Sequence, residues 1–395
     1  NDFIEPICIQ FSQSKELNTL IPIFLSIIVL MKIEELTNYL EELAPLHYQE
    51  SYDNSGLIVG NNRDEINNVL VSLDCIENVI DEAIEKQCNL IIAHHPIIFK
   101  GLKKITGKNY IERTIIKAIK HDIAIYAIHT NLDNVTGGVN FKIAERLGLR
   151  KVKILSPKDQ QLMKLTVFTP TQNTGQMLDA LYSAGAGEVG NYTNCSFRTV
   201  GKGTFKPNQL ANPKIGQRSR YEEVEESSIE VIFPSYLKSV VLTAMKKNHV
   251  YEEVSYHLYE LVNTNQTVGS GAVGFLKKPM STTDFLTLLK ENMQVSVIKH
   301  TALIKDEIKT VAVCGGSGGF LLNKAVSAGA DIFITSDYKY HEYFDADGKI
   351  IIADIGHYES EQFTKELIRD VILKKMTNFA TYLSEAKTNP VEYYY

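Results

Sequence analysis

The segment Asn89–Pro96 (NLIIAHHP) decides the fold of this chain, because an apolar run ends there in two adjacent histidines and a proline. Short apolar runs bounded by turn residues are typical of buried β-strands. Histidines that directly follow such a strand, here His94 and His95, lie at the carboxyl edge of the sheet, where open α/β sheets bind ligands. Neutral imidazole is the commonest metal ligand. A histidine pair is also compatible with ordinary hydrogen bonding, so a metal site requires further ligands at the same edge.

Strands and helices alternate on both sides of this segment. The nearest elements are predicted strands over Ile66–Asp74 and Ile123–His129, with predicted helices over Glu77–Lys86 and Tyr110–His121. From about residue 266 the alternation resumes, with predicted strands over Thr310–Cys314, Asp331–Thr335 and Lys349–Asp354. Such alternation predicts parallel sheets with helices on both faces. A helix, a turn and an apolar strand that ends in polar residues occur in both stretches, which suggests two related halves.

The pattern changes between these two stretches. The elements predicted from Lys164 to Leu261 follow the order β-α-β-β-α-β, which is the order of a ferredoxin-like unit. The polar residues Asn208–Glu226 within this unit predict a long surface loop. We therefore expect an α/β protein whose two alternating β/α halves form the core, with an inserted α+β domain. The expected divisions are a leader (1–30), an N-terminal half (31–160), the insert (161–265) and a C-terminal half with a tail (266–395).

The first thirty residues do not fit this organisation. Leu20–Leu30 is strongly apolar, but it is too short for a transmembrane helix and lacks the basic flank and cleavage site of a signal peptide. Met31 then begins an amphipathic helical pattern. We expect the folded protein to begin at Met31, after a leader of uncertain origin, and regard a membrane anchor as the less favoured interpretation.

Composition argues against several classes of protein. A length of 395 residues suits two or three domains. The net charge of -6 argues against a broad nucleic-acid-binding surface, so direct binding to duplex DNA is not expected. The five cysteines form no Cys-x-x-Cys pair. This arrangement fits a reducing compartment such as the cytoplasm better than a disulfide framework.

Carboxylates and a third histidine follow other predicted strands. Asp133 lies just beyond the strand that ends at His129. His357 and Glu361 follow the last predicted strand and lie four residues apart at the start of a helix, so both can face the same point. The complete candidate set is His94, His95, Asp133, His357 and Glu361. Mixed nitrogen and oxygen ligands suit Zn²⁺, Mn²⁺, Fe²⁺, Co²⁺ or Ni²⁺, and five ligands suit two ions with a bridging carboxylate.

These motifs resemble those of a dinuclear-metal-centre family, the GTP cyclohydrolase I type 2 homologues, which are also called NIF-three-like proteins. The similar segments are Tyr52–Gly60 (YDNSGLIVG), Leu90–Phe99 (LIIAHHPIIF), His129–Asn140 (HTNLDNVTGGVN), Cys314–Gly319 (CGGSGG), Thr335–Glu342 (TSDYKYHE) and Asp354–Glu361 (DIGHYESE). The resemblance covers essentially all of the chain from Met31 onward. One departure is Tyr52, which stands where the family usually has tryptophan, so an aromatic residue is retained.

The resemblance implies a specific centre and assembly. The metal ligands would be the five residues of the candidate set, with Glu361 as the bridge. Each subunit would hold two divalent metal ions, with zinc expected first and iron, manganese, cobalt or nickel as alternatives. The subunits would form a toroidal homohexamer whose metal sites face an internal cavity. The insert would be of the PII/CutA type.

Neighbouring residues leave alternatives open. His129 is either a ligand or a supporting residue, and we favour support because Asp133 completes the family set. Asp337 and His341 follow the strand Asp331–Thr335, where they either act as general acid and base or make only local hydrogen bonds. Gly315–Gly319 lacks the spacing of a phosphate-binding loop, so we predict a tight strand-to-helix turn, with anion binding as the alternative.

Two functional hypotheses follow. The first is a metal-dependent hydrolase that acts on a nucleotide or phosphoester through a metal-bridging hydroxide, with GTP cyclohydrolysis as one case. The second is a non-catalytic metal-handling or regulatory protein, which the inserted domain motivates. In either case the expected partner is a small-molecule substrate or ligand.

Overall fold

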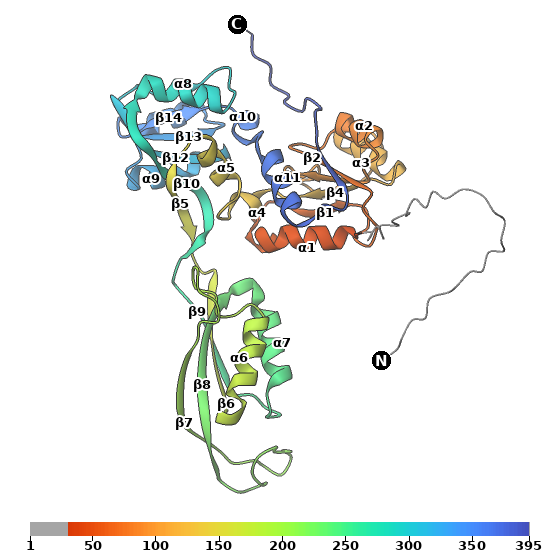
Figure 1. Cartoon of the computed structure of the whole chain (residues 1–395), viewed down its shortest axis with the longest axis vertical. Coiled ribbons are helices and arrows are strands. Elements are labelled where there is room, and N and C mark those ends of the chain that lie inside the picture. Colours follow the sequence, from red (N-terminus) through yellow and green to blue (C-terminus); the bar gives the residue numbers. More distant parts are fainter. Residues whose placement is uncertain (1–30, 395) are drawn as a thin grey trace, which may run out of the picture.

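The computed structural model describes residues 31–394, so the predicted leader lies outside the described residues. Figure 1 shows two α/β lobes side by side and a third unit that projects away from them. The strands form three sheets, of five, six and four strands. The prediction of a mixed α/β fold is confirmed. In residues 31–394 we find no helix that is long and apolar enough to cross a membrane.

The N-terminal lobe contains the sheet that was predicted from the alternating pattern. In the order β1-β4-β3-β2-β15, its strands are Gly56–Val59, Ala124–Ala127, Leu90–Ala93, Asn68–Ser72 and Ala380–Leu383. All are parallel except β1, which pairs antiparallel with β4. Helices α2 (Glu77–Glu85) and α3 (Tyr110–Lys120) cover one face. Helix α1 (Ile33–Leu43) buries Ile33, Leu36 and Leu40 on the other, as its amphipathic pattern predicts.

The C-terminal lobe contains the six-stranded sheet. In the order β11-β14-β13-β12-β10-β5, its strands are Lys299–His300, Ile351–Asp354, Ile332–Ser336, Glu307–Ser317, Asn265–Ser281 and Arg150–Lys158. Strands β12, β13 and β14 are parallel, and the others pair antiparallel. Its helices are α8 (Thr282–Asn292) and α9 (Leu322–Ser327), with 3-10 turns at Gly319–Leu321 (η4) and Tyr340–Ala346 (η5).

The two lobes exchange elements. Helix α5 (Val139–Arg146) and β5 precede the insert in sequence, yet both pack in the C-terminal lobe. Helix α11 (Thr364–Lys375) and β15 return to the N-terminal lobe near the end of the chain. One continuous cluster of buried apolar side chains therefore runs between the two large sheets. This shared core holds the facing edges of the lobes in a fixed relation.

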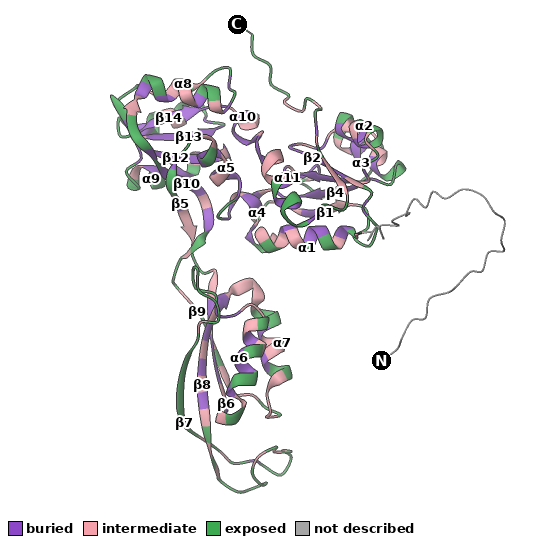
Figure 2. Ribbon diagram, in the orientation of Figure 1, coloured by how far each residue is buried: buried purple, intermediate pink, exposed green. Residues whose placement is uncertain are grey.

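The third unit has a four-stranded antiparallel sheet of its own. Its elements, in chain order, are β6 (Leu162–Pro170), α6 (Thr174–Ser183), β7 (Phe197–Phe205), β8 (Glu222–Pro234), α7 (Lys238–Asn248) and β9 (Tyr256–Glu260). The strand order is β7-β8-β6-β9, and α6 and α7 pack on one face over a separate small core. The edge strand β7 is largely exposed (Figure 2).

The predicted surface loop in this unit extends too far toward the C-terminus. The loop was expected to extend to Glu226, but β8 begins at Glu222 and pairs with β7 from there. These first residues of β8 extend beyond the apolar core, so they carry glutamates and lack the apolar periodicity by which a strand is predicted.

Candidate metal centre

The two lobes enclose a cavity of about 1660 Å³ at the carboxyl ends of β3, β4 and β14. His94 and His95 directly follow β3. Asp133 ends the short helix α4 (Thr130–Asp133), which follows β4. His357 and Glu361 are the first and last residues of α10 (His357–Glu361), after β14. The parallel strands thus deliver all five candidate ligands to one place, and Figure 1 shows α10 between the lobes.

The side chains form three overlapping groups that could each hold a metal ion. The groups are His94, His95 and His129; His95, His357 and Glu361; and His94, Asp133 and Glu361. Within each group, one ligand atom from every residue lies within 4.8 Å of the others. Because Glu361 belongs to two of the groups, the carboxylate that was predicted as a bridge occupies a shared position.

Each histidine ring is oriented by a hydrogen bond at Nδ1. The partners are the Ile128 carbonyl oxygen for His94 (2.8 Å), Asp74 for His95 (2.8 Å), Asp53 for His129 (2.7 Å) and Asp337 for His357 (2.6 Å). Such a bond keeps a proton on Nδ1 and leaves Nε2 as the coordinating atom. The Nε2 atoms of His95 and His357 lie 3.0 and 3.1 Å from Glu361 Oε2. The arrangement matches the oriented histidines of metal centres.

Two buried polar atoms of this cluster have no hydrogen-bond partner among the described residues. They are Nε2 of His94 and Oδ1 of Asp133, for which residues 31–394 supply no partner. They lie 3.6 Å apart, too far for a hydrogen bond. Leaving such groups unsatisfied is costly, at about 1–3 kcal/mol each. A divalent cation coordinated by both atoms removes that cost, so the residues present fit a metal ion.

Burial and charge set the protonation of the cluster. Burial lowers the pKa of His94 to about 3, so its Nε2 is free to coordinate at neutral pH. Burial acts in the same direction on His95 and His357, but their hydrogen bonds to carboxylates raise the pKa of His95 to about 9 and that of His357 to about 11. Although burial opposes it, the two histidines hold the pKa of Glu361 well below its usual range. A metal must displace these histidine protons, so binding releases protons.

The glycine-rich segment Gly315–Gly319 allows the backbone to lie close to the candidate ligands. Gly316 has φ +61°, and a Cβ there would lie 2.5 Å from Glu361 Oε1 and 3.3 Å from His357 Nε2. Its backbone N–H donates to Ser360 Oγ at 2.9 Å, which ties the segment to α10. The chain turns here from β12 into η4, as predicted. Glycine is therefore required because the backbone lies directly against the candidate ligands.

The three predicted residues outside the ligand set, His129, Asp337 and His341, lie at different distances from the cluster. His129 comes closer than its favoured supporting role implies, since its ring is grouped with those of His94 and His95. Asp337 lines the cavity and is hydrogen-bonded to His357, but it belongs to none of the three groups. His341 is exposed in η5 and is not among the residues that line the cavity. Its assignment as general acid or base stays a prediction.

Sequence reasoning missed Asp74 and the C-terminal segment. Asp74 lies just beyond β2, at the same sheet edge, so the strand-end rule applied to every strand would have found it. The C-terminal segment (residues 387–393) contributes to the cavity wall through residues 387–391 and Tyr393. Thr388 Oγ1 donates to Asp74 Oδ2 at 2.7 Å, and the Tyr393 hydroxyl donates to Glu359 Oε1 at 3.2 Å. The end of the chain thus supports the carboxylate that orients His95.

Fold and site together define a two-lobed α/β protein with a histidine and carboxylate cluster, able to hold metal, between its lobes. The family model described as Duf34/NIF3 (NGG1p interacting factor 3) matches residues 31–390. The chain therefore belongs to the Duf34/NIF3 family.

Individual relatives are similar over nearly their whole length. A protein of Halalkalibacterium halodurans named GTP cyclohydrolase 1 type 2 homolog is 40% identical over 356 residues, which are 89% of this chain and 95% of the relative. Its Bacillus subtilis namesake is 38% identical, over 90% of this chain and 97% of the relative. Among solved structures, a Bacillus cereus protein related to NIF3 superposes with a TM-score of 0.80 at 36% identity, covering 92% of this chain and 100% of that one.

Proposed function

We propose that this protein binds two divalent metal ions between its lobes and is a metal-dependent hydrolase of a nucleotide or phosphoester. The observation that carries the proposal is the buried, unpartnered pair of His94 Nε2 and Asp133 Oδ1 beside an oriented histidine cluster. One ion would be held by His94, Asp133 and Glu361. The other would be held by His95, His357 and Glu361.

Bound divalent ions would supply Lewis acidity for the activation of water and the polarisation of the electrophile. The chain supplies the orientation. Asp74 and Asp337 hold the Nδ1 protons of His95 and His357, so both rings present Nε2 to the same carboxylate. We assign Asp337 a positioning role through His357, because it has no direct place among the three groups.

The cavity has features that suit a nucleotide. Tyr52 and Phe99 line it and are 68% and 49% exposed, so their rings are available for stacking on a base. The Phe99 ring also lies edge-on to His129, with 5.6 Å between centroids, so a stacked base would be held beside the metal ligands. Lys100 lines the same cavity and offers a cation to a phosphate.

The test combines metal analysis with a substrate screen. The purified protein is expected to contain two equivalents of metal per chain and, after loading, to hydrolyse at least one nucleotide or phosphoester. A His94→Ala/Glu361→Ala variant is the inactive control, and His300→Ala, at an exposed histidine of β11, is the matched control. Equal rates for the wild type and the double variant on every substrate would rule out the hydrolase.

A non-catalytic metal-handling or regulatory role is the second candidate. It is favoured by the separate unit that projects from the lobes, with its own sheet and core. Metal exchange against a chelator distinguishes it from a hydrolase with tightly held ions. Release of metal only on unfolding would exclude a carrier.

The finer assignments are also proposals. The strand order β7-β8-β6-β9, with both helices on one face, supports a ferredoxin-like insert of the PII/CutA type. Zinc is the metal we expect first, since nitrogen and oxygen ligands suit it. The described cysteines, Cys75, Cys88, Cys195 and Cys314, have free thiols, which supports a cytoplasmic location. The proposed homohexamer predicts a sixfold chain mass in light scattering.

A further inference from the structure

The projecting unit has a pocket of its own, distant in the fold from the metal centre. The pocket has a volume of about 640 Å³, within the range of small-molecule sites. It is lined by β6, β7, β8 and β9 and by residues 206–215 and 251–253. The α6 and α7 helices pack on the opposite face of the sheet, since the strand residues that face them are buried and the pocket residues are not.

Gly201 lies in the wall of this pocket and has no structural need to be glycine. It lies in the middle of β7, where glycine weakens a strand. It is not among the positive-φ residues, and a Cβ built on it would meet no described atom within 4 Å. Gly203, two residues on, differs, because the Glu226 carboxylate lies over its Cβ position and would have to move to admit a side chain. A strand glycine that faces open space is expected where a ligand approaches the backbone.

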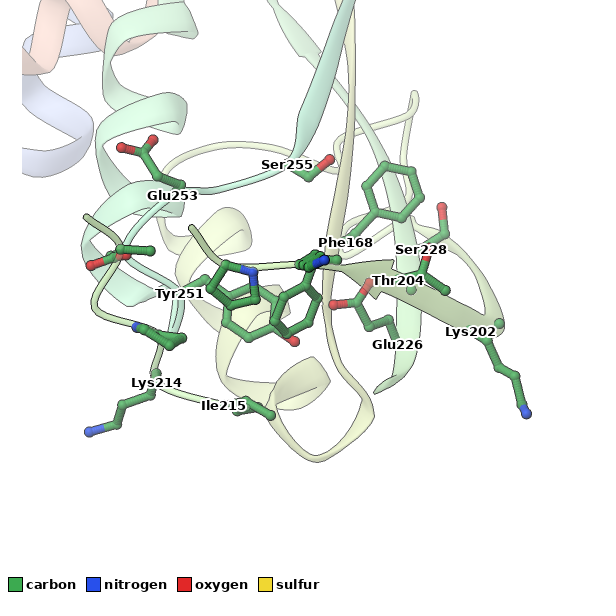
Figure 3. Close-up of a pocket in the computed structure, with 18 of the residues that line it drawn as sticks. Phe168, Lys202, Thr204, Lys214, Ile215, Glu226, Ser228, Tyr251, Glu253 and Ser255 are labelled. Atoms are coloured by element: carbon green, nitrogen blue, oxygen red, sulfur yellow. The ribbon is translucent and has the colours of Figure 1, made fainter. Parts of the chain in front are cut away.

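A buried hydroxyl and a carboxylate lie together in the pocket. The Tyr251 hydroxyl is buried and makes no hydrogen bond of acceptable geometry with the described residues, although the Glu226 carboxylate lies near it. Figure 3 shows the Tyr251 hydroxyl and the Glu226 carboxylate close together, with the Phe168 ring to one side, whereas the Lys202 and Lys214 side chains extend away from them. The centre therefore offers hydrogen-bond acceptors and a hydroxyl rather than a cationic site.

Aromatic rings surround these polar groups. The Phe168 ring lies edge-on to the His257 ring, with 5.5 Å between centroids. The centroids of the Phe205 and Tyr251 rings lie 5.9 Å apart. All four residues line the pocket. Rings in this arrangement favour a planar guest, and a carboxylate beside them favours a guest with N–H donors.

We propose that this pocket binds a planar heteroaromatic compound with N–H donors, of the purine nucleoside class. The ring lies over Gly201 against the aromatic side chains, and its N–H groups donate to Glu226 while the Tyr251 hydroxyl completes its hydrogen bonding. The proposal is independent of the metal centre.

Calorimetric titration of the full chain with adenosine and guanosine tests the proposal, with ribose as the probe that lacks the ring. We expect at least one nucleoside to bind and ribose not to bind. Gly201→Val fills the space that the ring needs and is expected to abolish binding without lowering the melting temperature, because valine is favoured in strands. Glu226→Gln is expected to weaken binding about tenfold or more, as for loss of a hydrogen bond to a charged group.

Two control variants distinguish a loss of ligand contacts from a loss of structure. Glu225→Gln removes the same charge at the neighbouring residue, which is exposed and does not line the pocket, and should leave binding unchanged. Tyr251→Phe removes the hydroxyl and keeps the ring, so it should weaken binding while the unit stays folded. Absence of nucleoside binding at millimolar concentration overturns the proposal, as does wild-type affinity in Gly201→Val. A Gly201→Val variant that changes only the oligomeric mass instead assigns the pocket to contact between copies.

Discussion

The two sides of the candidate metal centre are built in different ways. On the N-terminal side, the His94 side chain is 0% exposed and its Nδ1 is held by a backbone carbonyl. On the C-terminal side, His357 is 42% exposed and is held by Asp337, which is 46% exposed. The core fixes the first side, whereas a partly solvated ion pair fixes the second. We therefore expect an ion beside His94 to be held more rigidly than one beside His357.

The largest effect is expected from Glu361→Ala, because Glu361 contacts both sides. Its loss removes the shared carboxylate and leaves two histidines without their partner. We expect loss of both ions, with metal affinity reduced about 100-fold or more. Elemental analysis and the melting temperature with and without chelator measure this. Glu366→Ala, on the partly exposed α11, is the matched control, and retention of both ions by Glu361→Ala contradicts the shared role.

His94→Ala and His357→Ala compare the two sides directly. In metal-free protein, we expect His94→Ala to lower the free energy of unfolding by about 2–4 kcal/mol, since it opens a cavity in a buried region. His357→Ala should lower it by less, because the side chain is partly exposed and His95 still pairs with Glu361. Urea denaturation of both variants provides the comparison. Equal losses would show that burial does not distinguish the two sides.

Gly316→Ala tests the close approach of the backbone to Glu361. The positive φ angle alone costs an alanine about 1–2 kcal/mol, and the added methyl group also displaces the carboxylate. We expect both lower stability and weaker metal binding. Gly329→Ala is the control, because Gly329 has φ +70° but no atom within 4 Å of its Cβ position. If both variants lose only stability, the approach to Glu361 has no role in metal binding.

Thr388→Val tests the support that the C-terminal segment gives to His95. Loss of the hydrogen bond to Asp74 is expected to weaken metal binding about two- to tenfold, since such a bond contributes about 1 kcal/mol. Thr388→Ser retains the hydroxyl and should bind metal like the wild type. Chelator competition and the visible spectrum of the cobalt-loaded protein report on the His95 environment. If Thr388→Val has the metal affinity and cobalt spectrum of the wild type, the segment lines the cavity but does not support His95.

The smallest effect concerns residues 384–386, which precede this segment and are anchored at Glu82. Although partial burial opposes it, hydrogen bonds from Lys86 and Ser384 hold the pKa of Glu82 below its usual range. A lowered carboxyl pKa gives stability that is present above the unfolded value of about 4.3 and lost as pH falls through the folded value. Protease cleavage near residue 385 should therefore rise as pH falls below about 4. In Glu82→Gln, cleavage should no longer depend on pH in this way. If the variant is cleaved with the wild-type pH profile, Glu82 does not anchor these residues.

The sequence by itself determined the parallel strands that lead to the site and the chemistry at their ends. Apolar runs followed by His94, Asp133 or His357 encode both a buried strand and a polar group at its carboxyl edge, because both signals are local. The same rule misses the insert's β8 start, where glutamates replace the apolar pattern. It also gave His341 and Asp337 equal standing, although the structure places only Asp337 in contact with a candidate ligand.

Only the tertiary structure decided how these groups meet. His95 and Glu361 are 266 residues apart in sequence, and their contact depends on the core that the lobes share. The return of β15 to the first sheet carries Thr388 to Asp74, which no local pattern specifies. The need for glycine at 316 likewise arises from α10, which is far away in sequence. Local periodicity sets where a strand ends, whereas the burial of a common apolar core sets which strand ends face each other.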